Sequence, residues 1–385
     1  RQTPIHYGKQ FIDEQDIKAV EQVLKSDFLT CGPEIEKLEK KLCVVTGALY
    51  AVVLSNGTAA LHAACAAAEI KEGDEVITTP ITFAASSNAV LYCGGRPVFA
   101  DIDSETYNIS PAEIEKKITS RTKAVIAVDF TGQAAQLDDI KQICSKRSLM
   151  LIEDAAHSFG TKYKNQRVGS IADLTTFSFH PVKTVTGGEG GAVLTNDENL
   201  YRKLLLFRAH GITRDIRFLE NKNGEPWYYE QIDLGYNYRL TDFQAALISS
   251  QIDKLNLFIK RRKEIVKKYD REFSKIPELF LQKEIKESDT SRHLYLIHLK
   301  LEKLNGNRLE IFRALKAENI VCNVHYIPVY YFPYYEKLGY KRGSCPKAES
   351  LYERIITIPL YYSMTDQDVE DVVAAVRKVI DYYKK

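Results

Sequence analysis

Three short clusters of reactive side chains each follow an apolar run of the kind that forms a buried strand. They are SNGTAA at residues 55–60, EDAAH at 153–157 and SFHPVK at 178–183, the last running into the glycine-rich turn TVTGGEGG. In an open α/β sheet, ligands bind at the carboxyl ends of the strands. We therefore expect the three clusters to lie together at one edge of a sheet.

The first two clusters offer a phosphate site and an acid. Gly57 and Thr58 stand where a strand enters a helix, and N–H groups at a helix start bind phosphate, although an ordinary helix cap would use the same residues. Adjacent strand residues face opposite ways, so only one of Glu153 and Asp154 can face a given pocket. A buried carboxylate needs a positive partner, such as a protonated pyridine nitrogen. A solvated or helix-capping acid is the alternative interpretation.

The third cluster supplies an amine. Lys183 follows a predicted strand by three residues and enters a turn whose glycines let another group come close. An unperturbed lysine is protonated at neutral pH and is a poor nucleophile, but burial or Schiff-base formation removes that handicap. A solvated surface charge is the alternative. Amine, acid and phosphate cup together match the needs of one cofactor, pyridoxal 5'-phosphate (PLP).

Alternating elements must position these clusters. Apolar runs that are not strictly alternating are typical of strands buried on both faces of a mainly parallel sheet, and strand–helix alternation indicates an α/β domain. We predict seven strands, at 51–56, 75–80, 96–103, 123–130, 149–155, 175–180 and 191–196, and helices between them at 57–69, 84–93, 110–118 and 136–146.

The pattern changes near residue 250. We predict one long helix over 244–275, a strand over 293–301, a helix over 305–318, a strand over 319–326 and a capped amphipathic helix over 365–383. The polar stretch 212–232 predicts a loop. We therefore expect a large α/β domain over residues 1–255, including the N-terminal segment, and a small C-terminal α+β domain over residues 256–385.

Composition excludes several classes. With 53 basic and 51 acidic residues among 385, the net charge of +2 gives no support for a nucleic-acid or membrane-surface binder, and no apolar run is long enough to span a membrane. Seven widely spaced cysteines without CxxC indicate reduced thiols in the cytoplasm and no zinc site. GxxxxGK[ST], HExxH and GxSxG motifs are absent, and GGEGG lacks the spacing of a nicotinamide-cofactor loop.

The motifs also carry a family resemblance. The chain resembles the sugar aminotransferases of the DegT/DnrJ/EryC1/StrS family, and within it the UDP-4-keto-sugar 4-aminotransferases of the PseC type. The resemblance spans nearly the whole chain and rests on LTCGPEIEKLEKKL (29–42), SNGTAALHAA (55–64), TTPITFAASSNAV (78–90), LIEDAAHSFG (151–160), SFHPVKTVTGGEGG (178–191), FRAHGI (207–212), LGYNYRLTDFQAAL (234–247) and VHYIPVY (324–330).

The resemblance implies a PLP-dependent fold type I enzyme and an intertwined homodimer. It implies that Lys183 holds PLP as an internal aldimine and transfers the proton, and that Asp154 keeps the pyridine nitrogen protonated. It further implies that Phe83 stacks on the cofactor and that His157 lies near its phenolic oxygen. The remaining implied cofactor contacts are the amides of Gly57, Thr58 and Ala59, the hydroxyl of Ser178, and Asn237 reaching the phosphate from the partner subunit. A core position for Phe83 and a turn position for Asn237 are the alternatives.

The same resemblance implies a substrate site made by Thr30, Gly32, His180, Arg239, His325 and Tyr326. The alternative for His180 is a role in packing alone. The alternative for His325 and Tyr326 is that they are packed residues at the end of a strand. Many relatives have a histidine where this chain has Tyr330, and that departure bears on the sugar subclass.

The implied reaction is transfer of an amino group from an amino acid, glutamate above all, to C4 of a UDP-linked 4-keto-6-deoxy-N-acetylhexosamine. Four alternatives remain open. They are a 3- or 4-aminotransferase acting on a dTDP- or GDP-linked sugar, a 3-dehydratase, which would carry histidine in place of Lys183, a non-catalytic sugar-nucleotide-binding protein, and a nicotinamide oxidoreductase.

Overall fold

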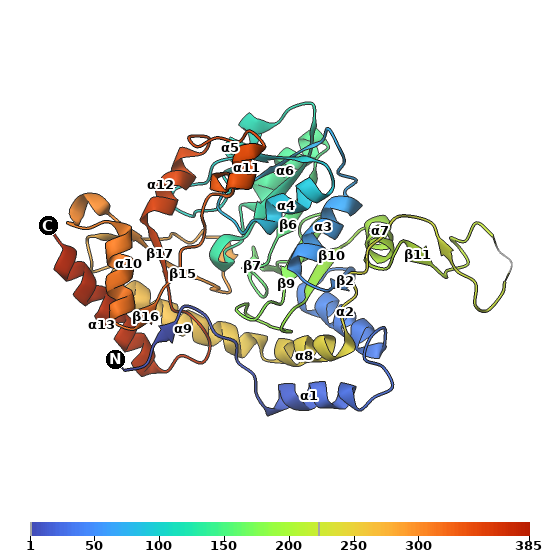
Figure 1. Cartoon of the computed structure of the whole chain (residues 1–385), viewed down its shortest axis with the longest axis horizontal. Helices are drawn as coiled ribbons and strands as arrows, with labels where there is room; N and C mark the ends of the chain where they lie inside the picture. The colour runs from blue at the N-terminus through green and yellow to red at the C-terminus, as the bar shows by residue number, and fades with distance from the viewer. Residues whose placement is uncertain (1, 222–223) are drawn as a thin grey trace.

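The computed structural model describes residues 2–221 and 224–385. At its centre is a seven-stranded sheet in the order β2-β10-β9-β6-β5-β3-β4, in which only β10 runs antiparallel to its neighbours (Figure 1). The strands are β2 (Tyr50–Leu54), β3 (Glu75–Thr78), β4 (Arg96–Phe99), β5 (Thr122–Val128), β6 (Met150–Asp154), β9 (Leu174–Ser178) and β10 (Gly191–Thr195). Each lies within or beside one of the seven predicted runs, so the predicted sheet is confirmed.

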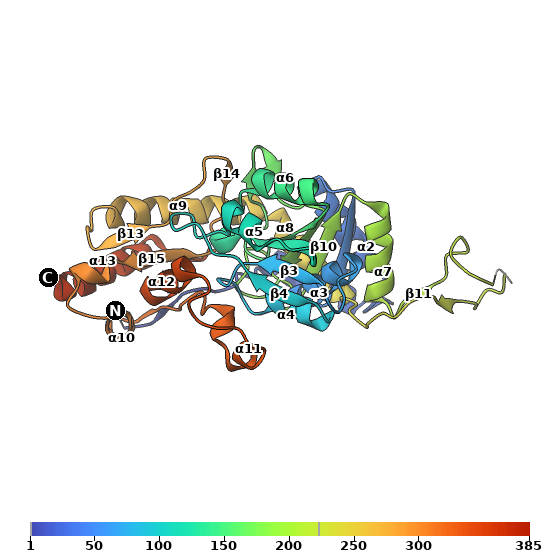
Figure 2. The ribbon, with the colours of Figure 1, turned by 90° about the horizontal axis from the view of Figure 1, so that it is seen from above.

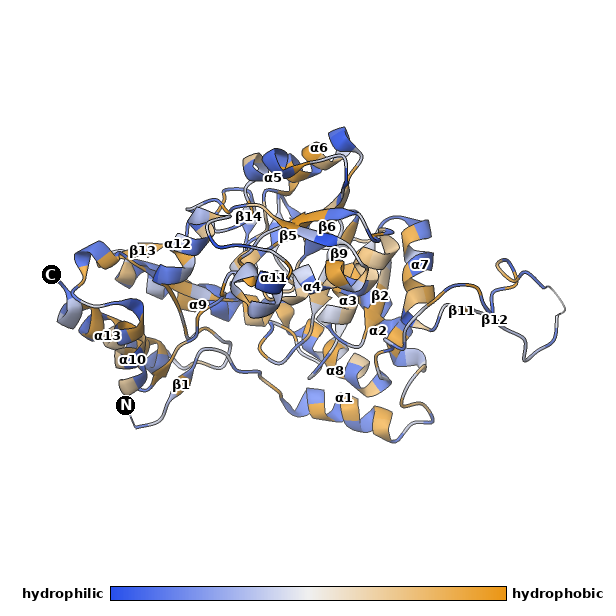
Figure 3. Ribbon diagram, turned by 45° about the horizontal axis from the view of Figure 1, so that its top comes forward, coloured by the Kyte–Doolittle hydropathy of each residue, from blue (hydrophilic) through white to orange (hydrophobic). Residues whose placement is uncertain are grey.

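Helices cover both faces of this sheet. Along β2, Val53 packs into one hydrophobic core and Leu54 into another, which is why the strand is apolar at successive positions. Helices α3 (Gly57–Ala67), α4 (Ala85–Tyr92) and α7 (Glu198–Arg208) close the core that contains Leu54; α2 (Pro33–Thr46), α5 (Pro111–Lys117), α6 (Leu137–Arg147) and α8 (Asp242–Asp253) close the core that contains Val53. Figure 3 shows the strands of the sheet as largely apolar beneath helices with polar outer sides.

The single helix predicted over 244–275 is wrong. The segment forms α8 and α9 (Leu255–Phe273), separated at Lys254, whose backbone (φ −98°, ψ 1°) leaves the helical range. The Lys254 ammonium forms ion pairs with Asp13 at 2.7 Å and with Asp16 at 2.6 Å, next to α1 (Glu14–Leu24). This contact comes from a segment far away in the chain, so the local sequence does not reveal it.

The C-terminal part has a separate core. A three-stranded antiparallel sheet of β13 (Leu279–Leu281), β15 (Tyr295–Leu299) and β17 (Ile355–Ile358) packs with α9, α10 (Arg308–Ala317) and α13 (Asp366–Tyr383). The predicted strand at 293–301 and helices at 305–318 and 365–383 are confirmed, the last with Thr365 as its cap. The remaining elements are β7 (Lys162–Tyr163), β8 (Gln166–Arg167), β14 (Ser288–Asp289), α11 (Pro333–Lys337) and α12 (Pro346–Arg354).

The N-terminal segment pairs with this C-terminal part. Strand β1 (Ile5–His6) runs parallel to β16 (Ile320–Val321). The strand predicted over 319–326 is therefore much shorter in the structure, where only these two residues of β16 are extended in a sheet. Ile5 lies in the same core as α10 and α13. The domain boundary at residue 255 stays a prediction, and the N-terminal segment assigned to the large domain contacts the other side of that boundary.

The stretch predicted as a loop over 212–232 is a hairpin arm. Strand β11 (Ile212–Thr213) pairs with β12 (Glu230–Gln231), residues 222–223 lie outside the described part, and the arm extends away from the body in both views (Figures 1 and 2). Several large apolar side chains on or beside it are exposed: Ile216, Trp227, Tyr229 and Leu234. Among the described helices, none has both the length and the apolar character needed to cross a bilayer.

Candidate active site

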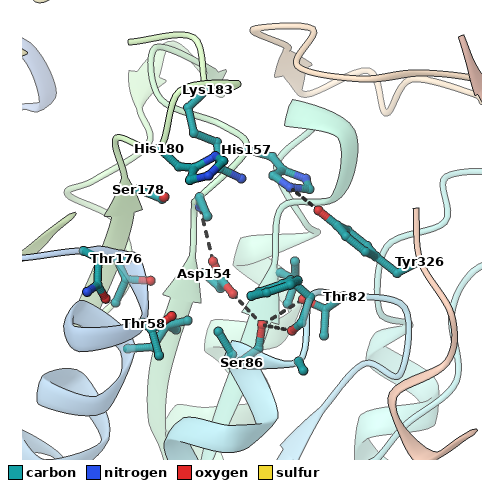
Figure 4. Close-up of a pocket in the computed structure, with 18 of the residues that line it drawn as sticks. Thr58, Thr82, Ser86, Asp154, His157, Thr176, Ser178, His180, Lys183 and Tyr326 are labelled. Carbon is teal, nitrogen blue, oxygen red and sulfur yellow. Dashed lines mark hydrogen bonds between the residues drawn. The ribbon is translucent and has the colours of Figure 1, made fainter. Parts of the chain in front are cut away.

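The carboxyl ends of β2, β6 and β9 open into a cavity of about 900 Å³ that all three sequence clusters line (Figure 4). The expectation that the clusters lie together is therefore confirmed. The predicted site residues that line the cavity are Gly57, Thr58, Ala59, Phe83, Asp154, His157, Ser178, His180, Lys183, His325 and Tyr326.

Lys183 lies in the turn that follows β9. Its backbone N–H donates to the carbonyl of His180 at 2.9 Å, which holds the turn, and its half-buried side chain reaches into the cavity (Figure 4). Burial lowers the pKa of the Lys183 amine to about 8, and the negative charge of Asp154 partly opposes that shift. Roughly a tenth of the amine is therefore neutral, and so nucleophilic, at pH 7, far more than for an ordinary lysine.

Asp154 is the acid that faces the cavity. It ends β6, is 4% exposed, and accepts hydrogen bonds from Ser86 Oγ at 2.6 Å and from the Ala156 N–H at 3.2 Å. Burial raises the pKa of Asp154, while these two hydrogen bonds and the charge of Lys183 oppose the rise. Glu153 does not line the cavity and hydrogen bonds to Thr175 instead, as strand alternation requires.

The first turn of α3 packs closely against the end of β9. A Cβ atom on Gly57 would lie 2.8 Å from Ser178 Cβ, so only glycine lets the first turn of α3 come this close to β9. Asn56 caps α3 by accepting the Ala59 N–H at 2.8 Å. The Ala59 amide is therefore already engaged, which leaves the amides of Gly57 and Thr58 and the hydroxyls of Thr58 and Ser178 as the donors at this end.

Histidine and tyrosine side chains form the opposite wall. His157 Nε2 lies 3.0 Å from Tyr326 Oη, and its ring centroid lies 4.5 Å from that of His293. Burial lowers the pKa of both histidines well below the ordinary range, so both rings are neutral. No hydrogen-bond partner reaches His157 Nδ1 within the described chain. Phe83, 63% exposed, lies across the cavity with its ring centroid 6.4 Å from that of Tyr326.

Four predicted site residues lie outside the cavity of this chain: Thr30, Gly32, Asn237 and Arg239. Thr30 pairs with Thr241, and the Gly32 N–H donates to Asp242 at 2.9 Å. Asn237 is exposed and pairs through its backbone with Ala209. Tyr330 is also outside: it is fully buried and donates to Glu349 at 2.6 Å, so it is a core residue here.

Comparisons with known proteins agree with this geometry. The family model of the DegT/DnrJ/EryC1/StrS aminotransferases matches residues 10–377. The chain belongs to this family. Spore coat polysaccharide biosynthesis protein SpsC of Bacillus subtilis is 40% identical (97% of this chain, 96% of that protein), and UDP-4-amino-4,6-dideoxy-N-acetyl-beta-L-altrosamine transaminase of Campylobacter jejuni is 38% identical (99% of both). The solved structure of Helicobacter pylori PseC, an aminotransferase involved in the biosynthesis of pseudoaminic acid, superposes with a TM-score of 0.92 at 32% identity, covering 99% of this chain and 100% of that one.

This DegT-family chain is thus a PLP-dependent sugar aminotransferase with fold type I. Solved structures that are similar to it include the PLP form and the pyridoxamine 5'-phosphate (PMP) form of a sugar aminotransferase from Streptococcus pneumoniae that is described as putative. The donor set fits PLP: one buried acid, one amine with a lowered pKa, and a glycine cradle with hydroxyls at a helix start.

Several cavity residues were missed from the sequence: Tyr7, Thr82, Ser86 and His293. Ser86 stands inside the motif TTPITFAASSNAV, but nothing local shows that its hydroxyl reaches Asp154. Tyr7 follows β1 and packs against His325, with ring centroids 5.2 Å apart. Both depend on contacts across large sequence separations.

Proposed function

We propose that this aminotransferase moves an amino group from L-glutamate to C4 of a UDP-linked 4-keto-6-deoxy-N-acetylhexosamine and forms a 4-amino sugar nucleotide. The observation that carries the chemistry is the meeting of Lys183, Asp154 and Gly57 in one cavity. The sugar and the position rest on similarity to the Campylobacter jejuni transaminase and to PseC.

Bound PLP supplies a ring that withdraws electrons from the carbon that loses a proton. Lys183 Nζ would hold the cofactor covalently until the amine of the amino-acid donor displaces it. The freed Lys183 amine would then accept the α-proton of the donor and, in the second half-reaction, deliver a proton to the sugar carbon that receives nitrogen. Asp154 would pair as a carboxylate with the pyridine nitrogen, and the hydrogen bonds from Ser86 and Ala156 favour that ionised form.

The other cavity residues bind and orient. Phe83 would pack against the cofactor ring, and neutral His157 would lie near its phenolic oxygen. The phosphate is held by the backbone of Gly57, Thr58 and Ala59 and the hydroxyl of Ser178, the Ala59 amide being the weakest donor because Asn56 engages it. His180, His325 and Tyr326 contact the sugar nucleotide.

Absorption spectroscopy tests the cofactor assignment. We expect wild-type protein reconstituted with PLP to show the visible band of a lysine Schiff base, and Lys183→Ala to lack the band and lose activity by at least about 1,000-fold. Lys164→Ala, on an exposed side chain, is the matched control. A wild-type protein without the band, or a Lys183→Ala variant that keeps it, would refute the assignment.

The substrate assignment needs product analysis. The enzyme is incubated with glutamate and, in separate reactions, UDP- and dTDP-linked 4-keto-6-deoxy sugars, and products are identified by mass and NMR. A UDP-linked 4-amino product supports the proposal. A 3-amino product, or turnover of the dTDP-sugar alone, supports the alternative aminotransferase, and absence of turnover despite a normal PLP band supports a binding protein. A location in the cytoplasm stays a prediction.

We further propose a homodimer with shared active sites. The support is the placement of Asn237, Arg239, Thr30 and Gly32 outside the cavity of their own chain, together with the exposed apolar arm. In this proposal Asn237 of one subunit reaches the phosphate bound to the other, and the other three contact the sugar nucleotide.

Hybrid dimers test the sharing directly. Lys183→Ala and Asn237→Ala chains are each inactive or impaired alone, and coexpression produces hybrids with one intact site. We expect about a quarter of the wild-type activity, because half of the dimers are hybrids and each has one functional site of two. No recovery in hybrids, or a monomer by light scattering, contradicts the shared site.

A further inference from the structure

Two more carboxyl groups are enclosed on the face of the sheet opposite the cavity. Glu153 precedes Asp154 in β6 and Asp129 directly follows β5, and both are 0% exposed. In the parallel register Ala127 lies beside Glu153 and Val128 beside Asp154, so Asp129 extends from the same face as Glu153. The two carboxyl groups therefore lie within reach of each other.

The donors around this pair are few and uncharged. Thr175 Oγ donates to Glu153 Oε2 at 2.9 Å, while Ser158 Oγ and the Ala135 N–H donate to Asp129 at 2.5 and 2.9 Å. No donor reaches Glu153 Oε1 within the described chain. Among the residues that the structure describes, no cationic side chain hydrogen bonds to either carboxyl, and the core on this face is apolar.

Two ionised carboxylates cannot share such a site. Carboxylates only accept hydrogen bonds, so a contact between them becomes attractive only when a proton lies between them. Burial raises the pKa of Asp129 to about 7, and burial together with the charge of Asp129 raises the pKa of Glu153 well above its ordinary range. Asp154, on the other side of the sheet, is a further ionisable group near the pair, and its charge also raises the pKa of both carboxyls.

We propose that Asp129 and Glu153 share a single proton and act as positioning residues for the turn that carries Ala156 and His157. The proton lies on Glu153, because Asp129 receives two donors and Glu153 receives one. The ionised Asp129 then holds Ser158, the residue next to His157. Limiting the pair to one negative charge also helps Asp154 stay ionised. The positioning role rests on the proposed functions of Asp154 and His157, whereas the shared proton does not.

Infrared spectroscopy of the PLP-loaded enzyme detects the proton directly. We expect the carbonyl stretch of a buried, protonated carboxylic acid at neutral pH, lost in Glu153→Gln and unchanged in the exposed control Glu36→Gln. Absence of the band in wild type, or its persistence in Glu153→Gln, would overturn the shared proton. This readout is independent of turnover, so it does not depend on the substrate assignment.

The pH dependence of the melting temperature provides a second test. Because the folded pair retains a proton that the unfolded chain releases near its ordinary acid pKa, stability falls as pH rises from about 4 through the folded pKa. We expect this fall to be shallower in Glu153→Gln, whose amide cannot ionise. An identical slope in the two proteins contradicts the proposal.

Kinetics test the positioning role. Glu153→Gln can still donate to Asp129, so its kcat is expected within about twofold of wild type, whereas Glu153→Ala should lose about tenfold. If Glu153→Ala fails to fold, Ser158→Ala replaces it: this variant should keep the infrared band and lose a similar part of kcat. Equal losses in Glu153→Gln and Glu153→Ala, or a normal kcat in Ser158→Ala, would overturn the role.

Discussion

The hydroxyl of Ser86, in α4, donates a 2.6 Å hydrogen bond to Oδ2 of Asp154, at the end of β6. It stabilises the ionised carboxylate and so opposes the rise in the pKa of Asp154 that burial causes.

Ser86→Ala should therefore raise the pKa of Asp154. The acid limb of the profile of kcat/KM against pH is expected to move to higher pH by about one unit, because one hydrogen bond to the ionised form is lost. Ser87→Ala, one residue along α4 and outside the cavity, is the control and should leave the limb in place. An acid limb at the same pH in Ser86→Ala and wild type would show that Ser86 does not influence the pKa of Asp154.

Asp154→Asn should separate cofactor binding from turnover. The asparagine still accepts from Ser86 and fills the same space, so PLP binding should persist, but no negative charge remains opposite the pyridine nitrogen. We expect kcat to fall by at least about 100-fold. Absorption titration measures the retained PLP. A kcat equal to that of wild type would show that Asp154 has no part in the chemistry.

The reactivity of Lys183 should follow its lowered pKa. Only the neutral amine attacks an aldehyde, so the rate at which apoenzyme combines with PLP should rise with pH and level off above about 8. Because the charge of Asp154 raises the pKa of Lys183, the midpoint should move to lower pH in Asp154→Asn. Stopped-flow absorbance measures both. A rate that keeps rising towards pH 10 would indicate an unperturbed lysine.

Gly57→Ala should damage the phosphate end of the cavity. The new Cβ would lie 2.8 Å from Ser178 Cβ, so α3 or β9 must shift. We expect a loss of about 1–3 kcal/mol in the free energy of unfolding and weaker PLP binding. Gly8→Ala, whose Cβ would meet Val182 at an ordinary 3.6 Å, is the control. Ser178→Gly should restore the stability of Gly57→Ala, and equal stability of Gly57→Ala and wild type would exclude the clash.

The central strands and the three clusters of reactive residues can be predicted from short stretches of the sequence. The central strands are apolar at successive positions because both faces are buried, and this signal is present in each run by itself. Lys183, Asp154 and Gly57 are predicted together because strand ends place them at one edge.

The rest depends on distant partners. The break between α8 and α9 falls at Lys254, which forms ion pairs with Asp13 and Asp16, and Ser86 reaches Asp154 in β6 from α4. The hairpin of β11 and β12 pairs only two residues on each side, too few for a period to be visible. Asp129 and Glu153 are 24 positions apart, and only the parallel register of β5 and β6 brings them together.

The pairing of β1 with β16 also constrains the order of assembly during synthesis. Ile5 finds its partner in Ile320, and Tyr7 then reaches the cavity wall beside His325. On the ribosome β1 must therefore stay unpaired until residues 320–321 have emerged. The cavity wall at Tyr7 and His325 consequently forms only after the residues at the start of α3 have long been made.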